Sequence, residues 1–138
     1  MSKDYPWGKG TIKAISDVTA NDVDKTYTVP AGKCAALDCI SVILTTTATA
    51  ANRKILIQIT DGTNIVYDFE FGTQAASLTN YYFIYPGGYY LTTGTIRFAP
   101  VPPFKLPAGY TVRVVESMAV DPAADDMSVH VFVAEYDV

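Results

Sequence analysis

The sequence predicts an all-β protein, an antiparallel two-sheet sandwich of about eight strands, from three observations. Apolar residues recur at every second position, which is the period of a strand with one buried face. Valine, isoleucine, threonine, tyrosine and phenylalanine, which suit pleated sheets, are abundant. Turn residues interrupt the alternating stretches at short intervals, as they do in sandwiches and barrels.

Two clear turns fall among the first five predicted strands. Pro30-Ala31-Gly32 ends one strand and starts the next. Asp61-Gly62-Thr63-Asn64 joins two stretches that both alternate, which predicts a β-hairpin. These strands are expected near residues 10–16, 24–29, 34–46, 53–60 and 65–71.

The last four predicted strands are bounded by proline, glycine and acidic residues. Pro86-Gly87-Gly88 ends an aromatic strand, and Pro107-Ala108-Gly109 repeats the earlier turn ahead of another long strand. Pro100, Pro102 and Pro103 argue against a central strand, because proline lacks the amide that a ladder needs. These strands are expected near residues 78–85, 94–99, 110–119 and 128–136. Residues 1–9 are expected to form an N-terminal arm, and residues 10–138 a single sandwich domain.

Composition excludes several classes of partner. Of the 138 residues 49% are hydrophobic and only 17% charged, which predicts that partners or sister copies cover part of the apolar surface. The net charge is −4 and the basic residues are scattered, so nucleic acid is not expected as a partner. No apolar run approaches the ~20 residues of a membrane span, and the N-terminus lacks the apolar core of a signal peptide.

The sequence does not predict an enzyme, a cofactor or a catalytic residue. His130 is the only histidine and lies within the last alternating stretch, without a nucleophile motif elsewhere. Asp68 and Glu70 fall two apart on the polar side of one strand, where they indicate solvent or an interface. No zinc ligand set is expected. The candidates for calcium are confined to one acidic loop, which is alternatively interpreted as a solvated turn. They are Asp121, Asp125 and Asp126.

The two cysteines are predicted to be unpaired. Cys34 and Cys39 lie in one expected strand, where five residues span ~17 Å. A disulfide requires Cα atoms ~5.5 Å apart. The two side chains should also point to opposite faces of the sheet unless a bulge intervenes.

Tyrosine and tryptophan supply the candidate interface residues. Alternation places only half of an aromatic strand in the core, so several tyrosines should face outward and offer rigid contact area. An aromatic residue in an N-terminal arm is also expected to dock on a partner. The alternative is an aromatic sandwich core with a few half-exposed rings. The candidates are Tyr5, Trp7, Tyr81, Tyr82, Tyr85, Tyr89 and Tyr90.

Residues 25–136 resemble small structural proteins of tailed bacteriophages. The resemblance is carried by five stretches: Tyr27–Lys33, Ile40–Thr49, Ala51–Asp61, Leu106–Val114, and Asp121–Met127 with the strand that ends at Glu135-Tyr136. It implies a jelly-roll-like sandwich that decorates heads or sits on tails, and it carries no catalytic residues.

The sequence therefore leaves two hypotheses about function open, each from a different class. The first is a capsid decoration protein, located in the virion and made in the host cytoplasm, that binds the major capsid protein or other virion proteins. It is expected to be a homo-oligomer, with a trimer favoured. The second is a tail adhesin or carbohydrate-binding module, whose outward tyrosines would stack on sugar rings. A small hydrolase is a third and less favoured hypothesis.

Overall fold

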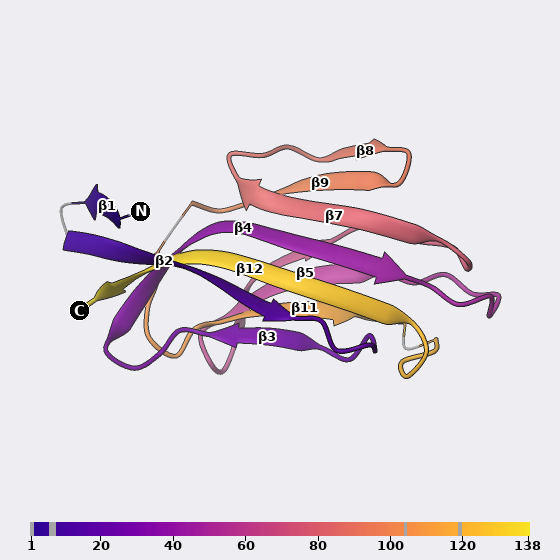
Figure 1. Ribbon diagram of the computed structural model, residues 1–138, viewed down its shortest axis with the longest axis horizontal. Helices are drawn as coiled ribbons and strands as arrows, with labels where there is room; N and C mark the ends of the chain where they lie inside the picture. Colours follow the sequence, from indigo (N-terminus) through magenta and orange to yellow (C-terminus); the bar gives the residue numbers. More distant parts are fainter. Residues whose placement is uncertain (1, 6–7, 104, 119) are drawn as a thin grey trace.

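Two β-sheets pack face to face, and Figure 1 shows β5 and β11 lying behind β4 and β12. The computed structural model describes residues 2–5, 8–103, 105–118 and 120–138, with side chains from residue 10 onward. The predicted all-β sandwich is confirmed. None of the described residues forms a helix that is long and apolar enough to cross a membrane.

The larger sheet has eight strands, in the order β1-β2-β12-β4-β7-β9-β8, with β10 paired to β4. The smaller sheet has four, in the order β3-β11-β5-β6. The strands of the larger sheet are β1 Ser2–Tyr5, β2 Gly8–Asp17, β4 Lys33–Thr45, β7 Thr79–Pro86, β8 Leu91–Thr93, β9 Ile96–Val101, β10 Lys105–Leu106 and β12 Asp126–Asp137. Those of the smaller sheet are β3 Lys25–Thr28, β5 Ile55–Thr60, β6 Ile65–Glu70 and β11 Thr111–Glu116.

The pairing confirms the predicted hairpin of β5 and β6 and departs from a purely antiparallel sandwich at one place. β7 and β9 run parallel, with Tyr85 opposite Pro100. β8 covers β9 only from Ile96 to Phe98, so Pro100 lies on an open edge where its missing amide removes no ladder bond to β8. The prolines therefore allow an edge strand here although they exclude a central one.

The N-terminal segment contains regular pairing. β1 pairs antiparallel with the start of β2, with Ser2 opposite Thr11 and Tyr5 opposite Gly8. The first strand of the expected domain thus begins at Gly8, two residues before the expected boundary. β1 is the outermost strand of its sheet.

A bulge in β4 changes which side chains point inward. Cys39 lies opposite Phe132 and Leu37 opposite Val133, so Asp38 is an extra residue in β4. Before the bulge the β4 residues in the core between the sheets have odd numbers, such as Leu37, and after it they have even numbers, such as Ile40. The bulge therefore turns the side chains of both cysteines to the outer side of the sheet, against the expectation for an unbroken strand.

The core lies between the two sheets and is formed by alternate aliphatic residues. The inward residues of β5 are three fully buried isoleucines. They belong to one cluster with the inward residues of β4, β11 and β12. The core residues of these four strands include Ile55, Ile57, Ile59, Ile40, Val42, Leu44, Val112, Val114, Val129, Val131 and Val133.

Candidate interaction surface

Strand β7 divides its tyrosines between the core and the outer side of the larger sheet. Tyr81, Phe83 and Tyr85 alternate with the buried Tyr82 and Ile84. The expectation that Tyr82 belongs to an interface is wrong, because its side chain is fully buried. The hydroxyl of Tyr82 donates a hydrogen bond to Gln74 Oε1 at 2.7 Å, which satisfies its polar group inside the core.

The outward aromatic rings of β7 continue onto β9. Phe83 and Phe98 are paired residues whose rings stack, with centroids 5.7 Å apart and planes at 29°. Tyr85 meets Phe98 edge to face at 6.4 Å. These are favourable ring geometries, and they hold the aromatic side chains in place on the sheet.

The same outer side of the larger sheet is free of charge over six strands, and we call this surface the aromatic face. Strand pairing places its members side by side, and five of them, Ile12, Tyr81, Leu91, Ile96 and Phe132, are 36–40% exposed. Asp38, Lys105 and Asp126 lie only at its margins. The described residues of the face are Ile12, Ala14, Ser16, Ser128, His130, Phe132, Cys39, Ser41, Ile43, Tyr81, Phe83, Tyr85, Leu91, Thr93, Ile96, Phe98 and Pro100.

The outer side of the smaller sheet has the opposite character. Arg113 of β11 donates hydrogen bonds to Gln58 Oε1 at 3.2 Å and to Asp24 Oδ2 at 2.6 Å. Lys54 forms an ion pair with Glu70, and Asp68 is exposed beside them in β6. Charged pairs of this kind are typical of a solvated surface. The two outer surfaces of the sandwich therefore differ, and only the one on the larger sheet is apolar.

Two further tyrosines form a separate patch, which we call the rim tyrosines. Tyr89 and Tyr90 lie between β7 and β8 and are 66% and 53% exposed. The ring of Tyr90 lies 6.0 Å from that of Phe69 in the smaller sheet, so it faces the edge of the sandwich rather than the aromatic face. Of the predicted interface residues in the N-terminal arm, Trp7 and the side chain of Tyr5 lie outside what the structure describes.

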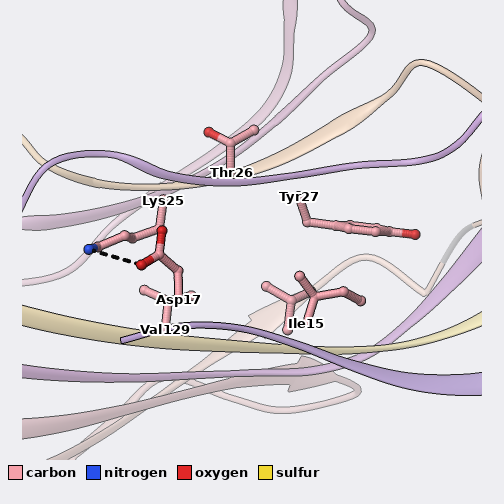
Figure 2. Close-up of a pocket in the computed structure, with 7 residues that line it drawn as sticks. Ile15, Asp17, Lys25, Thr26, Tyr27 and Val129 are labelled. Carbon is pink, nitrogen blue, oxygen red and sulfur yellow. Dashed lines mark hydrogen bonds and ion pairs between the residues drawn. The ribbon is translucent and has the colours of Figure 1, made fainter. Parts of the chain in front are cut away.

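A small pocket opens between β2 and β3 at the edge of the sandwich (Figure 2). Ile15, Tyr27 and Val129 form its apolar walls, and Lys25 Nζ lies 3.4 Å from Asp17 Oδ1 at its polar end. Its volume is about 20 Å³, which is room for about one water molecule. This pocket cannot hold an organic substrate.

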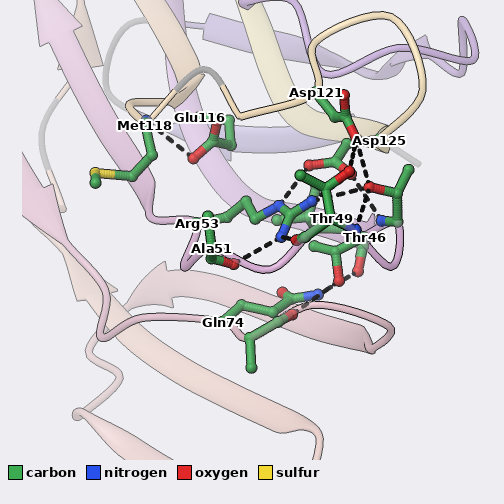
Figure 3. A network of polar contacts seen from close by, with 12 residues as sticks. Thr46, Thr49, Ala51, Arg53, Gln74, Glu116, Met118, Asp121 and Asp125 are labelled. Carbon is green, nitrogen blue, oxygen red and sulfur yellow. Dashed lines mark hydrogen bonds and ion pairs between the residues drawn. The ribbon is translucent and has the colours of Figure 1, made fainter.

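The acidic loop that the sequence offers for calcium is tied to an arginine instead (Figure 3). Arg53 donates from Nε to Asp125 Oδ2 at 2.7 Å and from Nη2 to Asp125 Oδ1 at 3.1 Å. Asp121 accepts hydrogen bonds from the hydroxyls of Thr47 and Thr49 at 2.6 and 2.5 Å, which hold its pKa below the usual value.

The donor set of this loop does not suit a divalent cation. The guanidinium of Arg53 already supplies the positive charge next to Asp125, and both side chains are fully buried. Asp126, the first residue of β12, points to the outer side of the sheet. No group of three histidine, cysteine, aspartate or glutamate side chains in the described part of the chain is placed to hold a metal ion.

A buried carboxyl lies beside this network. Asp22 is 3% exposed, and burial together with Glu116 and Asp125 raises its pKa to about 6. Its loop is held to the acidic loop by a hydrogen bond from the amide of Asp22 to the carbonyl of Pro122 at 3.1 Å. Neither the sequence spacing nor the charge pattern pointed to Asp22 or Arg53, because their partners are distant in the chain.

His130 and the cysteines complete the candidate residues. His130 lies on the aromatic face, where its Nδ1 is 2.7 Å from Ser16 Oγ. Both cysteines are free thiols, Cys34 buried and Cys39 partly exposed. Burial and the neighbouring Asp38 raise the pKa of the Cys39 thiol, which makes it a poor nucleophile at neutral pH.

Comparison with known proteins adds no family. No family model and no curated protein matches the chain. A structure of turnip yellow mosaic virus is 8% identical with a TM-score of 0.37, over 93% of this chain and 80% of that one. A structure of infectious bursal disease virus, strain Gx, is 11% identical with a TM-score of 0.41, over 95% of this chain and 38% of that one.

A non-viral structure matches in the same way. Pili of Bacillus endospore appendages are 14% identical with a TM-score of 0.28, over 97% of this chain and 95% of that one. Scores and identities this low carry no argument about function. The solved structures to which the chain is similar thus include virus structures, and the assignment of a sandwich rests on the chain's own two sheets.

Proposed function

We propose that the chain is a non-enzymatic structural protein of a tailed-phage virion, and that it decorates and stabilises the outer lattice of the head. The observation that supports this proposal is the contrast between the two outer surfaces of the sandwich. One is charged, as a solvated surface is, and the other carries aromatic and aliphatic side chains without a charge among them. Its aromatic and aliphatic side chains border a polar but uncharged row, Ser16, His130 and Ser41, and a largely apolar surface of this kind suits a contact site.

The described residues suit contact better than chemistry. The polar networks around Arg53 and Tyr82 are internally satisfied and lie in the core, where they position loops and strands. The one histidine bonds to a serine on a flat sheet surface rather than in a cleft. A catalytic site needs several polar groups that converge on a concave pocket. The pocket beside Tyr27 is too small for a substrate, and the larger hollow of about 310 Å³ at Lys33, Cys34 and Lys105 has mainly apolar walls.

Attachment to the particle is assigned to the rim tyrosines and the N-terminal arm. Tyr89 and Tyr90 are the most exposed aromatic side chains among the described residues. Tyrosine and tryptophan commonly anchor protein interfaces, so Tyr5 and Trp7 of the arm extend the same proposal. The partner is the major capsid protein or another virion protein.

Cryo-electron microscopy of particles from the phage that encodes the chain tests this function. The proposal expects density for the sandwich on the outer surface of the head. Density confined to the tail, or particles that lack the protein, would contradict it. Labelling with an antibody against the chain gives a second readout on the same particles.

The alternative function, a tail adhesin or carbohydrate-binding module, is favoured by the exposure of Tyr81 and Tyr89, whose rings could stack on sugars. A glycan array separates the two functions. Saturable binding to a defined glycan that is lost in Tyr81→Ala or Tyr89→Ala would favour the adhesin. Absence of glycan binding together with head density would favour decoration.

A further inference from the structure

We propose that the aromatic face is covered by the aromatic face of a second copy of this chain, related to the first by a two-fold axis. The inference rests on the proposed function in one respect, the role of this face as a contact surface, and it names the partner. Two sandwiches would then stack as four sheets, with the two larger sheets in the middle.

Charge is the first argument for a second copy. The chain has a net charge of −4, so two copies repel each other wherever their charged surfaces meet. In a two-fold interface the same patch meets itself, and any excess charge in it meets a like charge. The aromatic face avoids this cost, since its charged neighbours Asp38, Lys105 and Asp126 lie at the margins.

Area is the second argument. Strands lie ~4.8 Å apart and advance ~3.3 Å per residue, so a face with about five residues on each of five strands and three on β8 has a footprint of roughly 29 × 16 Å. Side chains that project from this footprint expose more area than the footprint itself. The footprint alone is therefore more than half of the ~800 Å² per partner of a standard stable interface, and the relief of the side chains adds to it. A smaller ligand would leave much of it uncovered.

Shape is the third argument. Two twisted sheets of the same hand pack face to face with their strands about 30° apart and ~10 Å between them. The aromatic rings that stand on β7 and β9 are already fixed by their contacts at 5.7 and 6.4 Å, so little side-chain freedom remains to be lost on association. A face with preset side chains on a twisted sheet favours a partner that is also a sheet.

This arrangement changes the expected oligomer. A face that meets its own copy closes a dimer, whereas the trimer favoured from the sequence needs two different patches. Tyr90 stays free in such a dimer, because its ring lies at the edge of the sandwich next to Phe69. Self-association and attachment to a particle then use different surfaces.

Sedimentation equilibrium of the purified chain tests the inference. A dimer with a dissociation constant in the micromolar range or tighter is expected. Tyr81→Glu and, independently, Ile96→Glu bury an unpaired charge of each copy in the interface and should weaken dimerisation at least 100-fold. Val66→Glu is the matched control, since Val66 is 49% exposed on β6 of the smaller sheet, away from the aromatic face. Circular dichroism confirms that each variant is folded.

Three outcomes would overturn the inference. They are a monomer at 100 µM, a trimer, and a dimer that both face variants leave intact while they remain folded. Each of these concerns the free chain alone. Head density in the microscopy experiment would still support the decoration function, so a failure of the dimer and a failure of the function can be told apart.

Discussion

Arg53 and Asp125 form a bidentate ion pair in which both side chains are fully buried, 72 positions apart in the sequence. The pair joins the segment before β5 to the loop before β12, and so it links one sheet to the other. Arg53 Nη1 also donates to the carbonyls of Thr49 and Ala51, at 2.8 and 2.7 Å. The guanidinium of Arg53 thus donates its hydrogen bonds to groups inside the protein rather than to solvent. The pair is therefore sensitive to the loss of either member.

Asp125→Asn or Asp125→Ala should therefore be strongly destabilising. Each leaves the guanidinium of Arg53 buried without its carboxylate, which costs about 3–5 kcal/mol in comparable pairs. Urea unfolding measures the change. Asp68→Asn is the matched control on the exposed side of β6 and should change the free energy of unfolding by less than about 0.5 kcal/mol. Equal effects of the two variants would show that the buried pair contributes nothing specific.

Gly10 offers a test of packing on the outer side of the larger sheet. A Cβ built at Gly10 would lie 2.4 Å from the ring of Tyr136, so Gly10→Ala requires the ring or the strand to move. The expected loss is about 1–3 kcal/mol, as for other overpacked sites. Gly72→Ala is the control, because there the nearest atom is 3.6 Å away. An unchanged melting temperature for Gly10→Ala would mean that the ring of Tyr136 moves freely.

Asp22 predicts a rise in stability on mild acidification. Its pKa of about 6 in the folded chain exceeds the ordinary value of 3.8, so between these pH values the folded state binds more protons than the unfolded state. The free energy of unfolding should then fall as the pH rises from about 4 to 6. Carboxyls with lowered pKa values, such as Asp61 and Asp121, act in the opposite direction only below about pH 4.

The variant Asp22→Asn isolates this contribution. It should flatten the dependence of the melting temperature on pH between 4 and 6. At pH 7 it should raise that temperature by ~3 °C for each kcal/mol of repulsion removed. A curve parallel to the wild type would assign the pH dependence to other groups.

The period of two was sufficient to predict the sandwich and the hairpin of β5 and β6, because alternation and turn residues are local properties. It could not predict the bulge at Asp38, which moves Cys39 to the same side of the sheet as Cys34. Alternation also separates Tyr81 from Tyr82 but does not say which of them faces the core.

The sequence also could not predict which distant residues strand pairing and loop packing bring together. Phe98 joins the aromatic face because β9 pairs with β7 in a register that sets it opposite Phe83, and the sequence gives no signal for this pairing. From the sequence Arg53 would be taken for an ordinary surface arginine. In the structure the loop before β12 folds over it and buries it. The acidic loop was recognised as a cluster of carboxylates, yet the cation that balances it could be found only in the structure.

Both cysteines should react as free thiols with a thiol reagent. They lie on the same strand five residues apart, which keeps them beyond the ~5.5 Å that a disulfide spans. Denatured protein kept without reductant should give two thiols per chain with a chromogenic disulfide reagent. In the native protein Cys39 should react slowly, because its pKa is raised. A value below two would indicate a bridge between chains.

Removal of the N-terminal arm should separate attachment from stability. Within the described residues, Ser2–Tyr5 pairs only with β2, at the edge of the larger sheet, and the pairing of β2 with β12 begins at Thr11. Deletion of residues 1–8 therefore leaves that ladder intact and should move the melting temperature by less than ~3 °C, equivalent to about 1 kcal/mol.

The same deletion should weaken binding to particles tenfold or more, because tyrosine and tryptophan anchors each contribute ~2 kcal/mol or more to interfaces. The double variant Tyr5→Ala with Trp7→Ala should reproduce the loss at full chain length, and Lys3→Ala should not. Co-sedimentation with particles that lack the protein measures all three. Undiminished binding by both the deletion and the double variant would transfer attachment to Tyr89 and Tyr90, and the variant Tyr89→Ala with Tyr90→Ala would then carry the whole loss.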